Sequence, residues 1–248
     1  MNHWRRAVHV AESIVVDHSP GVRAAPVVRI EEDAEGVTVV TEWVEDSQPT
    51  GLWLADRLGR FAGASLGGAA WLARGQLRSR LGLVERRGGW RTLARTPMAD
   101  VAAHLWERRG GWLDQLDALP QVPQHGDPSP GNLRGRSGED AVGIDWAHLG
   151  TGPVGGDLGY LSLSVREESG PLLDAYAAAL PAGLATREEA ALGARVVTVY
   201  TALTRVDWAL MRVADGEGAL AGKFRHPAVA PSIRAMQRQV AHIEALLA

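Results

Sequence analysis

The spacing of apolar residues changes along the chain, and this change predicts a β-containing first part followed by helices. Residues 4–16 have a helical pattern, which the Pro-Gly pair at residues 20–21 interrupts. Two runs rich in β-branched residues follow, at residues 26–31 and 37–43, and the acidic segment 33–36 supplies a turn between them. We therefore expect one antiparallel pair of strands, which is too small to be stable alone in water.

From Leu52 onward, most apolar residues recur at helical spacing. Thr186 and Glu189 have the spacing of a capping box, which predicts the start of a long helix that runs to about Val213. A last helix is expected from Pro231 to Leu247. The hexamer Glu-Arg-Arg-Gly-Gly-Trp occurs twice, at residues 85–90 and 107–112, and we interpret both copies as basic helix ends stopped by glycine.

Residues 119–153 interrupt the helices with a stretch rich in Gly, Pro and Asp that contains one short apolar strand at 141–144. Loop-rich stretches of this kind often carry chemistry. Asp127, Asn132 and Asp145 offer two carboxylates and a carboxamide on two loops, a donor set that suits Mg²⁺. An aspartate beside such a metal can orient a hydroxyl nucleophile. Taken alone, these residues also fit ordinary turns.

The order of the motifs is more specific than any one of them. The chain reads Gln124-His125-Gly126-Asp127, then Asn132, then Ile144-Asp145-Trp146, Gly152-Pro153 and Gly156-Asp157-Leu158. This order resembles the aminoglycoside phosphotransferase and choline kinase superfamily. The resemblance implies an α+β, protein-kinase-like fold with a reduced N-terminal β lobe at residues 1–46. A mainly helical C-terminal lobe, with the catalytic and metal loops, would occupy residues 47–248.

The resemblance also implies roles for the matching residues. Asp127 would be the catalytic aspartate that orients the acceptor hydroxyl, and Asn132 and Asp145 would hold Mg²⁺. His125 and Asp157 would support the loops.

Two further assignments concern pockets. Trp43, Val44 and Glu45 fall where a hinge between the lobes would contact the base of ATP through backbone groups. Trp146, beside Asp145, is expected to line a pocket. Acceptor choice lies in residues that no motif identifies, so the resemblance implies only a small-molecule substrate.

Composition narrows the classes of function. The chain has 248 residues, no cysteine, 26 basic and 29 acidic side chains, and a net charge of -3. The absence of cysteine excludes disulfides and thiolate sites. The slightly negative net charge argues against nucleic acid as a partner. No apolar run is long enough for a membrane span, so we expect a cytoplasmic protein with no membrane partner. Lys223 is the only lysine, which excludes a phosphate-anchoring lysine early in the chain.

That lysine count separates two hypotheses. Complete members of the superfamily grip the triphosphate with a strand lysine, which pairs with a helix glutamate, whereas Ala7 stands at the expected glutamate position. The first hypothesis is a Mg²⁺-dependent phosphotransferase with weak ATP binding. Tight binding of ATP would contradict that expectation and imply an arginine clamp, with Arg5, Arg6 and Arg23 as the first residues to test. The second is a repurposed pseudokinase that has lost phosphotransfer from ATP. It would bind a small molecule or partner, or catalyse a different step.

The two predicted strands also bear on assembly. An unpaired strand edge that carries valines tends to recruit another chain, so we expect a homodimer joined through the small lobe. A partner protein that supplies strands, or a monomer whose first helix covers the edge, are the alternatives.

Overall fold

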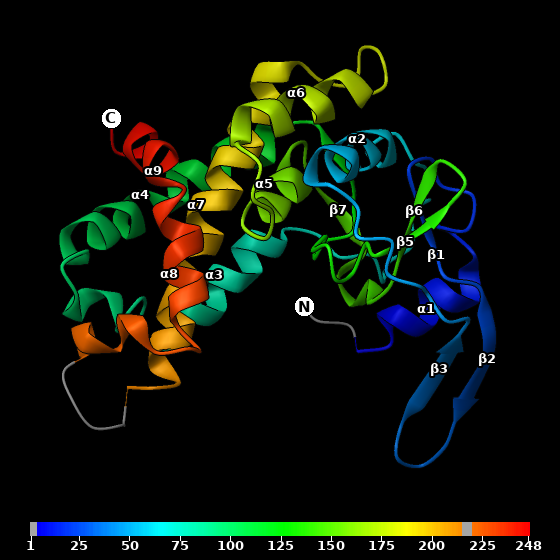
Figure 1. Cartoon of the computed structure of the whole chain (residues 1–248), viewed down its shortest axis with the longest axis horizontal. Helices are drawn as coiled ribbons and strands as arrows, with labels where there is room; N and C mark the ends of the chain where they lie inside the picture. Colours follow the sequence, from blue (N-terminus) through cyan, green and yellow to red (C-terminus); the bar gives the residue numbers. More distant parts are fainter. Residues whose placement is uncertain (1–3, 215–219) are drawn as a thin grey trace. The chain divides into compact units, whose positions relative to one another are not determined.

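The computed structural model describes residues 4–214 and 220–248 (Figure 1). It is a mixed α+β structure with small sheets, as predicted. The chain forms two compact units, Met1–Gly75 with Leu119–Ala194, and Gln76–Ala118 with Arg195–Ala248. This division differs from the predicted lobe boundary after residue 46, because the segment before that boundary shares a unit with the loop-rich stretch. No helix in the described part of the chain is long and apolar enough to cross a membrane.

The first unit contains all the described strands and the helices that cover them. Its elements are α1 (Arg6–Ser13), β1 (Val22–Ala24), β2 (Val27–Glu32), β3 (Val37–Thr41), α2 (Gly51–Phe61), β4 (Gln121–Gln124), β5 (Gly135–Ser137), β6 (Asp140–Gly143), η2 (Trp146–His148), β7 (Gly150–Pro153), α5 (Gly156–Ser162) and α6 (Ser169–Ala179). The strands form three small sheets, with orders β1-β6-β5, β2-β3 and β4-β7.

The predicted antiparallel pair is confirmed as β2 and β3. The Asp33 side chain stabilises the turn between them, because its Oδ1 accepts hydrogen bonds from the N–H groups of Glu35 (2.8 Å) and Gly36 (3.1 Å). The helix expected over residues 4–16 is shorter than predicted, since α1 ends at Ser13 and Ile14 takes a left-handed conformation.

Strands β1, β4, β5 and β7 were not predicted. β1 pairs in parallel with β6, with Val22 opposite Ala141, and β4 pairs with β7 in antiparallel fashion. The sequences Gln-Val-Pro-Gln and Gly-Thr-Gly-Pro of β4 and β7 contain few residues that favour strands. Contacts between distant segments, rather than local preference, therefore make these strands.

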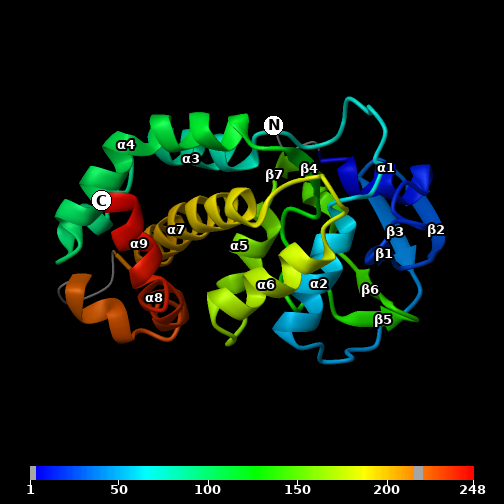
Figure 2. The same ribbon diagram turned by 90° about the horizontal axis from the view of Figure 1, so that it is seen from above.

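Helix α2 packs against α6 and α5, and Figure 2 shows α2 and α6 running side by side. Leu54, Leu58 and Phe61 lie on the buried face of α2, with exposed fractions of 2% or less. This face covers the segment that follows β6, because the ring of Phe61 lies 6.2 Å from the ring of Trp146, centroid to centroid.

The second unit is helical. Its elements are α3 (Gln76–Arg86), η1 (Leu93–Arg95), α4 (Ala99–Ala118), most of α7 (Arg187–Met211), η3 (Leu220–Arg225), α8 (Ala230–Gln237) and α9 (Val240–Leu247). Buried Asp207 fixes the turn before η1, because its Oδ1 accepts from the N–H (2.9 Å) and the hydroxyl of Thr92. Ion pairs of Arg109 with Glu85 and of Arg78 with Asp117 join α3 to α4.

The capping box at the start of α7 is confirmed. Thr186 N donates to Glu189 Oε2 (2.7 Å), and Glu189 N donates to Thr186 Oγ1 (3.1 Å). The side chains of the two residues thus satisfy backbone donors that the first turn of a helix leaves without partners.

Two predictions about helix ends are wrong. The hexamer at 85–90 does contain the end of α3, with Gly88 and Gly89 at positive φ, but the copy at 107–112 lies inside α4. The expected last helix is two helices, α8 and α9. The buried face also changes at this break, because Val240, which the helical spacing places on the inward face, is 49% exposed.

Candidate active site

The loop after β4 is built around the carboxylate of Asp157. Asp157 lies in the first turn of α5 and is 5% exposed. Its Oδ2 accepts from His125 N (2.7 Å) and its Oδ1 accepts from Gly126 N (3.0 Å). Gly126 has a φ of 82°, a left-handed conformation that glycine adopts without strain. Asp157 therefore joins the loop to α5 by two charge-assisted hydrogen bonds.

His125 lies beneath the same loop and is fully buried. Its Nε2 contacts the carbonyl oxygen of Ile144 at 2.9 Å, and its Nδ1 lies 3.3 Å from the N–H of Asp127. A neutral ring with the proton on Nε2 satisfies both contacts, since Nε2 then donates and Nδ1 accepts. Burial lowers the pKa of His125 to about 4, although the Ile144 carbonyl and the charges of Asp127 and Asp145 oppose this shift.

The two loops that carry the predicted site residues are hydrogen-bonded to each other. Asn132 Nδ2 donates to the backbone oxygen of Asp127 (2.9 Å), and the backbone oxygen of Asn132 accepts from Ile144 N (2.8 Å). Asp145 follows Ile144 directly and has left-handed backbone angles, φ 58° and ψ 60°. Asp127, Asn132 and Asp145 are thus brought into one region around His125.

The side-chain oxygens of these three residues have no protein partner in the described part of the chain. No arginine there pairs with Asp127 or Asp145, although the sequence contains 25 arginines. Two carboxylates and an amide oxygen, all without partners, fit the hard oxygen donors that Mg²⁺ prefers. Residues 4–214 and 220–248 contain no cluster of three or more His, Asp or Glu side chains suited to a metal. A cation here would therefore depend on the Asn132 amide and on oxygen atoms from substrate or water.

Two buried side chains hold the loop that carries Asp145. Arg6 of α1 hydrogen-bonds to it, and Trp146 of η2 packs beneath it. Arg6 is 2% exposed and donates from Nε to Trp71 O (2.8 Å) and from Nη1 to Ala147 O. The Trp146 ring lies 4.6 Å from the His125 ring, and its Nε1 donates to Gly143 O. Trp146 was expected to line a pocket, but at 6% exposure it is packed beneath the site.

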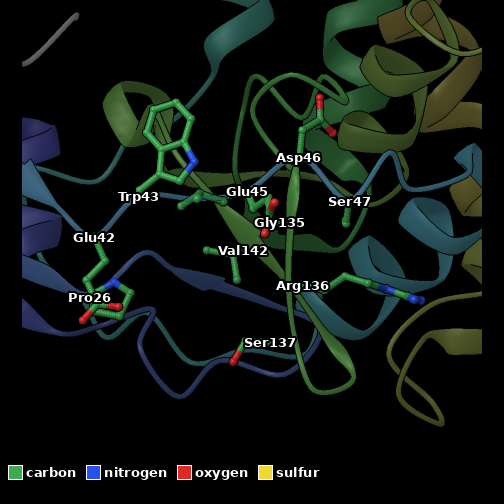
Figure 3. Close-up of a pocket in the computed structure, with 11 residues that line it drawn as sticks. Pro26, Glu42, Trp43, Glu45, Asp46, Ser47, Gly135, Arg136, Ser137 and Val142 are labelled. Carbon is green, nitrogen blue, oxygen red and sulfur yellow. The ribbon is translucent and has the colours of Figure 1, made fainter.

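A pocket of about 460 Å³ lies between the chain segment after β3 and the β5–β6 hairpin (Figure 3). Trp43, Val44 and Glu45, the residues of the expected hinge, line one wall. Their backbone N–H and C=O groups form no hydrogen bond with the rest of the described chain. Gly135 lines the opposite wall, and a Cβ there would collide with the Val44 side chain, so the close approach of the two walls requires glycine.

Two arginines near this pocket differ in whether a carboxylate of the protein pairs with them. Arg134 lies 3.6 Å from Asp46 in an ion pair, whereas Arg136 has no carboxylate partner in the described chain and stacks over Trp53 at 4.2 Å. Figure 3 shows Arg136 at the opposite end of the pocket from Pro26 and Glu42. No motif marks Arg136, and only its place in the structure reveals it.

The arginines considered as lysine replacements are engaged elsewhere. Arg5 pairs with Glu32, Arg23 pairs with Asp140, and Arg6 holds the Asp145 loop. Lys223 donates from Nζ to the carbonyl oxygens of Val213 and Ala214 in the second unit. None of these four side chains is therefore free to grip a triphosphate as an early lysine would.

Comparison with known proteins agrees with the fold and the motif order. The model of the phosphotransferase enzyme family (APH) matches residues 8–192. A choline/ethanolamine kinase family protein from Mesorhizobium loti is 18% identical, with a TM-score of 0.60 over 98% of this chain and 84% of that one. Choline kinase from Cryptosporidium parvum is 11% identical (TM-score 0.56, 96% and 77% covered). Aminoglycoside 2'-phosphotransferase-IIIa, solved as its GDP complex, is 12% identical (TM-score 0.53, 97% and 81% covered). The comparison with curated protein sequences finds no significant match.

Proposed function

The chain belongs to the phosphotransferase enzyme family, and we propose that it transfers a phosphoryl group from a nucleoside triphosphate to a hydroxyl group of a small molecule. The observation that carries this proposal is the set of unpartnered oxygens at Asp127, Asn132 and Asp145. These oxygens lie on two loops that are hydrogen-bonded to each other and anchored by Asp157. Asp127 and Asn132 are half-buried and Asp145 is exposed, so a ligand can reach their oxygens.

In this proposal each residue has a separate task. The Asp127 carboxylate orients the acceptor hydroxyl and accepts its proton as the oxygen attacks phosphorus. Asn132 and Asp145 would hold Mg²⁺, which supplies positive charge to the phosphate oxygens when it is bound. The neutral His125 ring fixes the Asp127 backbone from below and takes no part in proton transfer, because its proton is directed to the Ile144 carbonyl.

The 460 Å³ pocket would receive the base of the donor nucleotide. Its walls offer unpaired backbone donors and acceptors at Trp43, Val44 and Glu45, which can hydrogen-bond to the edge of a purine. Arg136 is a cationic side chain of this pocket that has no carboxylate partner in the described chain, so we assign it contact with the phosphates or ribose. The related aminoglycoside phosphotransferase was solved with GDP, so GTP should be tested as donor beside ATP.

The acceptor class is proposed from the names of the similar proteins. Choline, ethanolamine and aminoglycosides are the compounds in these names. All carry a hydroxyl group near a cationic nitrogen. We propose a small hydroxylated amine as the first acceptor to test, with release of nucleoside diphosphate as the readout.

The Asp127→Asn variant gives the most direct test. Asp127 contacts His125, Ser129 and Asn132 through its backbone atoms, so the variant should fold with an unchanged melting temperature. It should lose about 100-fold or more in transfer rate, because asparagine cannot accept the hydroxyl proton. Asp145→Asn should instead raise the Mg²⁺ concentration needed for half-maximal rate.

The matched control is Asp174→Asn, an exposed aspartate of α6 that pairs with Arg187, and it should keep full activity. Full activity in Asp127→Asn would contradict the assigned role.

A repurposed pseudokinase is the second candidate, and the missing lysine favours it. The only lysine is bonded to carbonyl groups of the second unit, and the lysine and its ion pair support phosphoryl transfer in other kinases. In that case the purified protein would release no diphosphate from ATP or GTP with any hydroxylated amine. It would also show no Mg²⁺-dependent rise in melting temperature at millimolar nucleotide.

A further inference from the structure

The outer edge of β2 has no strand beside it in the described chain. β2 belongs to a two-stranded sheet and pairs only with β3 there. Val28 is 59% exposed and Val27 is 39% exposed. In Figure 1 the β2–β3 hairpin projects from the rest of the first unit. Helix α1 packs against β3, so it does not take the place of a strand along β2. Exposed edges of this kind pair readily with further strands.

The register of the hairpin identifies the backbone groups that face this edge. Asp33 N donates to Gly36 O (3.0 Å), and Glu31 and Arg29 continue the same alternation opposite Thr38 and Val40. These residues therefore direct their N–H and C=O groups toward β3. The alternate residue Ile30 directs its own N–H and C=O outward, at the middle of the free edge.

The side chains around Ile30 make the edge complementary to itself. In an antiparallel pair with a two-fold axis at Ile30, that residue faces Ile30 of the partner subunit. Arg29 then faces Glu31 of the partner subunit, and by symmetry Glu31 faces Arg29 of the partner subunit. Opposite charges directly across a strand pair stabilise it, whereas like charges destabilise it. Charged residues on a strand edge usually prevent pairing. Here, however, the two-fold axis brings the positive charge of one copy opposite the negative charge of the other.

Within one chain, Arg29 Nε lies 2.8 Å from Glu31 Oε1, and both side chains are more than half exposed. Both are therefore on the same face of β2 and available to a second strand on that face. A strand without a basic and an acidic residue at the mirrored positions, or a strand in another register, would leave the two charges unmatched or opposite like charges. The pattern selects a second copy of this chain over an unrelated strand.

We propose that β2 pairs with β2 of a second copy about a two-fold axis at Ile30, forming a homodimer with a continuous four-stranded antiparallel sheet. Ile30 of each copy exchanges two backbone hydrogen bonds across the axis, and Arg29 and Glu31 form two symmetric ion pairs between the copies. This proposal does not depend on the proposed phosphotransfer.

Charge reversal at the two positions tests the register directly. R29E should place two glutamates opposite each other, and E31R should place two arginines opposite each other, so each variant alone should sediment near the monomer mass of 26.5 kDa. An equimolar mixture should form a heterodimer, because every interchain pair in it joins opposite charges. The double variant R29E/E31R should again form a homodimer and also keeps a reversed ion pair within the chain.

The matched control is the exposed pair Arg187 and Asp174, whose single reversals R187E and D174R should leave the dimer intact. Sedimentation equilibrium from about 1 to about 100 µM is the measurement, at low and high salt. A wild-type protein that stays monomeric over this range overturns the proposal. So does a dimer that persists in both single variants, or a mixture that does not pair although both variants show a native melting transition.

Discussion

His125 shows how one buried residue can couple stability to pH. Burial lowers its pKa to about 4 in the folded chain, against about 6.5 when the chain is unfolded. Between about pH 4 and about pH 6.5, His125 is protonated in the unfolded chain and neutral in the folded chain. The stability contributed by the neutral ring is therefore complete above about pH 6.5 and is lost as the pH falls toward 4. The difference corresponds to about 3 kcal/mol.

The measurement is the free energy of unfolding by urea at about pH 7 and about pH 4.5, for the wild type and His125→Gln. The wild type should lose about 2 kcal/mol more than the variant between these values. The variant should be less stable at neutral pH, because it loses the contacts of the ring with Ile144 and Asp127. An equal loss in both proteins would show that His125 titrates normally.

At the scale of single residues, the sequence was most informative where chemistry requires particular side chains. The order of the motifs grouped Asp127, Asn132 and Asp145, and the structure brings these three residues into one region around His125. The order of the motifs does not predict the surroundings of the Trp146 and Arg136 side chains. Whether an indole is packed beneath a loop or lines a pocket depends on neighbours such as Phe61 that come from distant parts of the chain.

At the scale of elements, α1 acts on the site through one buried side chain. Arg6 donates to the carbonyl of Ala147, two residues after Asp145, and to that of Trp71. Arg6→Met removes both donors and leaves these carbonyls unsatisfied. The expected cost is about 2–3 kcal/mol of unfolding free energy, and the Mg²⁺ requirement for transfer should rise because the Asp145 loop loses its support.

The neighbouring Arg5→Met is the control for this prediction. Arg5 lies on the surface of the first unit, paired with Glu32 across 2.5 Å, and both side chains are partly exposed. Exposed pairs contribute little, so Arg5→Met should change neither stability nor Mg²⁺ dependence appreciably. Equal effects of the two substitutions, measured by urea unfolding and initial rates, would show that the bonds from Arg6 do not position the loop.

The elements that local sequence predicted well are those with strong local signals. The β2–β3 hairpin has an Asp33 turn, and the start of α7 has a capping box, so short-range contacts decide both. The hexamer shows the limit of such signals. One copy contains the end of α3 and continues through two glycines of positive φ, whereas the other copy is helical throughout inside α4. Six identical residues thus take two conformations, because tertiary packing outweighs a preference of about 1 kcal/mol for each glycine.

At the scale of the whole molecule, the missing lysine and the observed pocket together predict weak nucleotide binding. Without a lysine at the phosphates, the unpaired backbone groups of residues 43–45, Arg136 and Mg²⁺ must supply the affinity. We expect a dissociation constant near about 1 mM for Mg-ATP, or about -4 kcal/mol. At about 5 mM nucleotide, binding of this strength stabilises the folded state by about 1 kcal/mol.

A stabilisation of that size should raise the melting temperature by about 2–4 °C. Arg136→Gln should remove most of the rise, because it deletes an unpaired cation of the pocket, whereas Arg187→Gln, on the exposed pair with Asp174, should keep it. A dissociation constant near about 1 µM would instead give about 5 kcal/mol, and a rise well above about 10 °C. Such a rise would mean that arginines replace the lysine far more effectively than the observed ion pairs allow. A rise that needs no Mg²⁺ would show that nucleotide binds without the oxygens of Asn132 and Asp145.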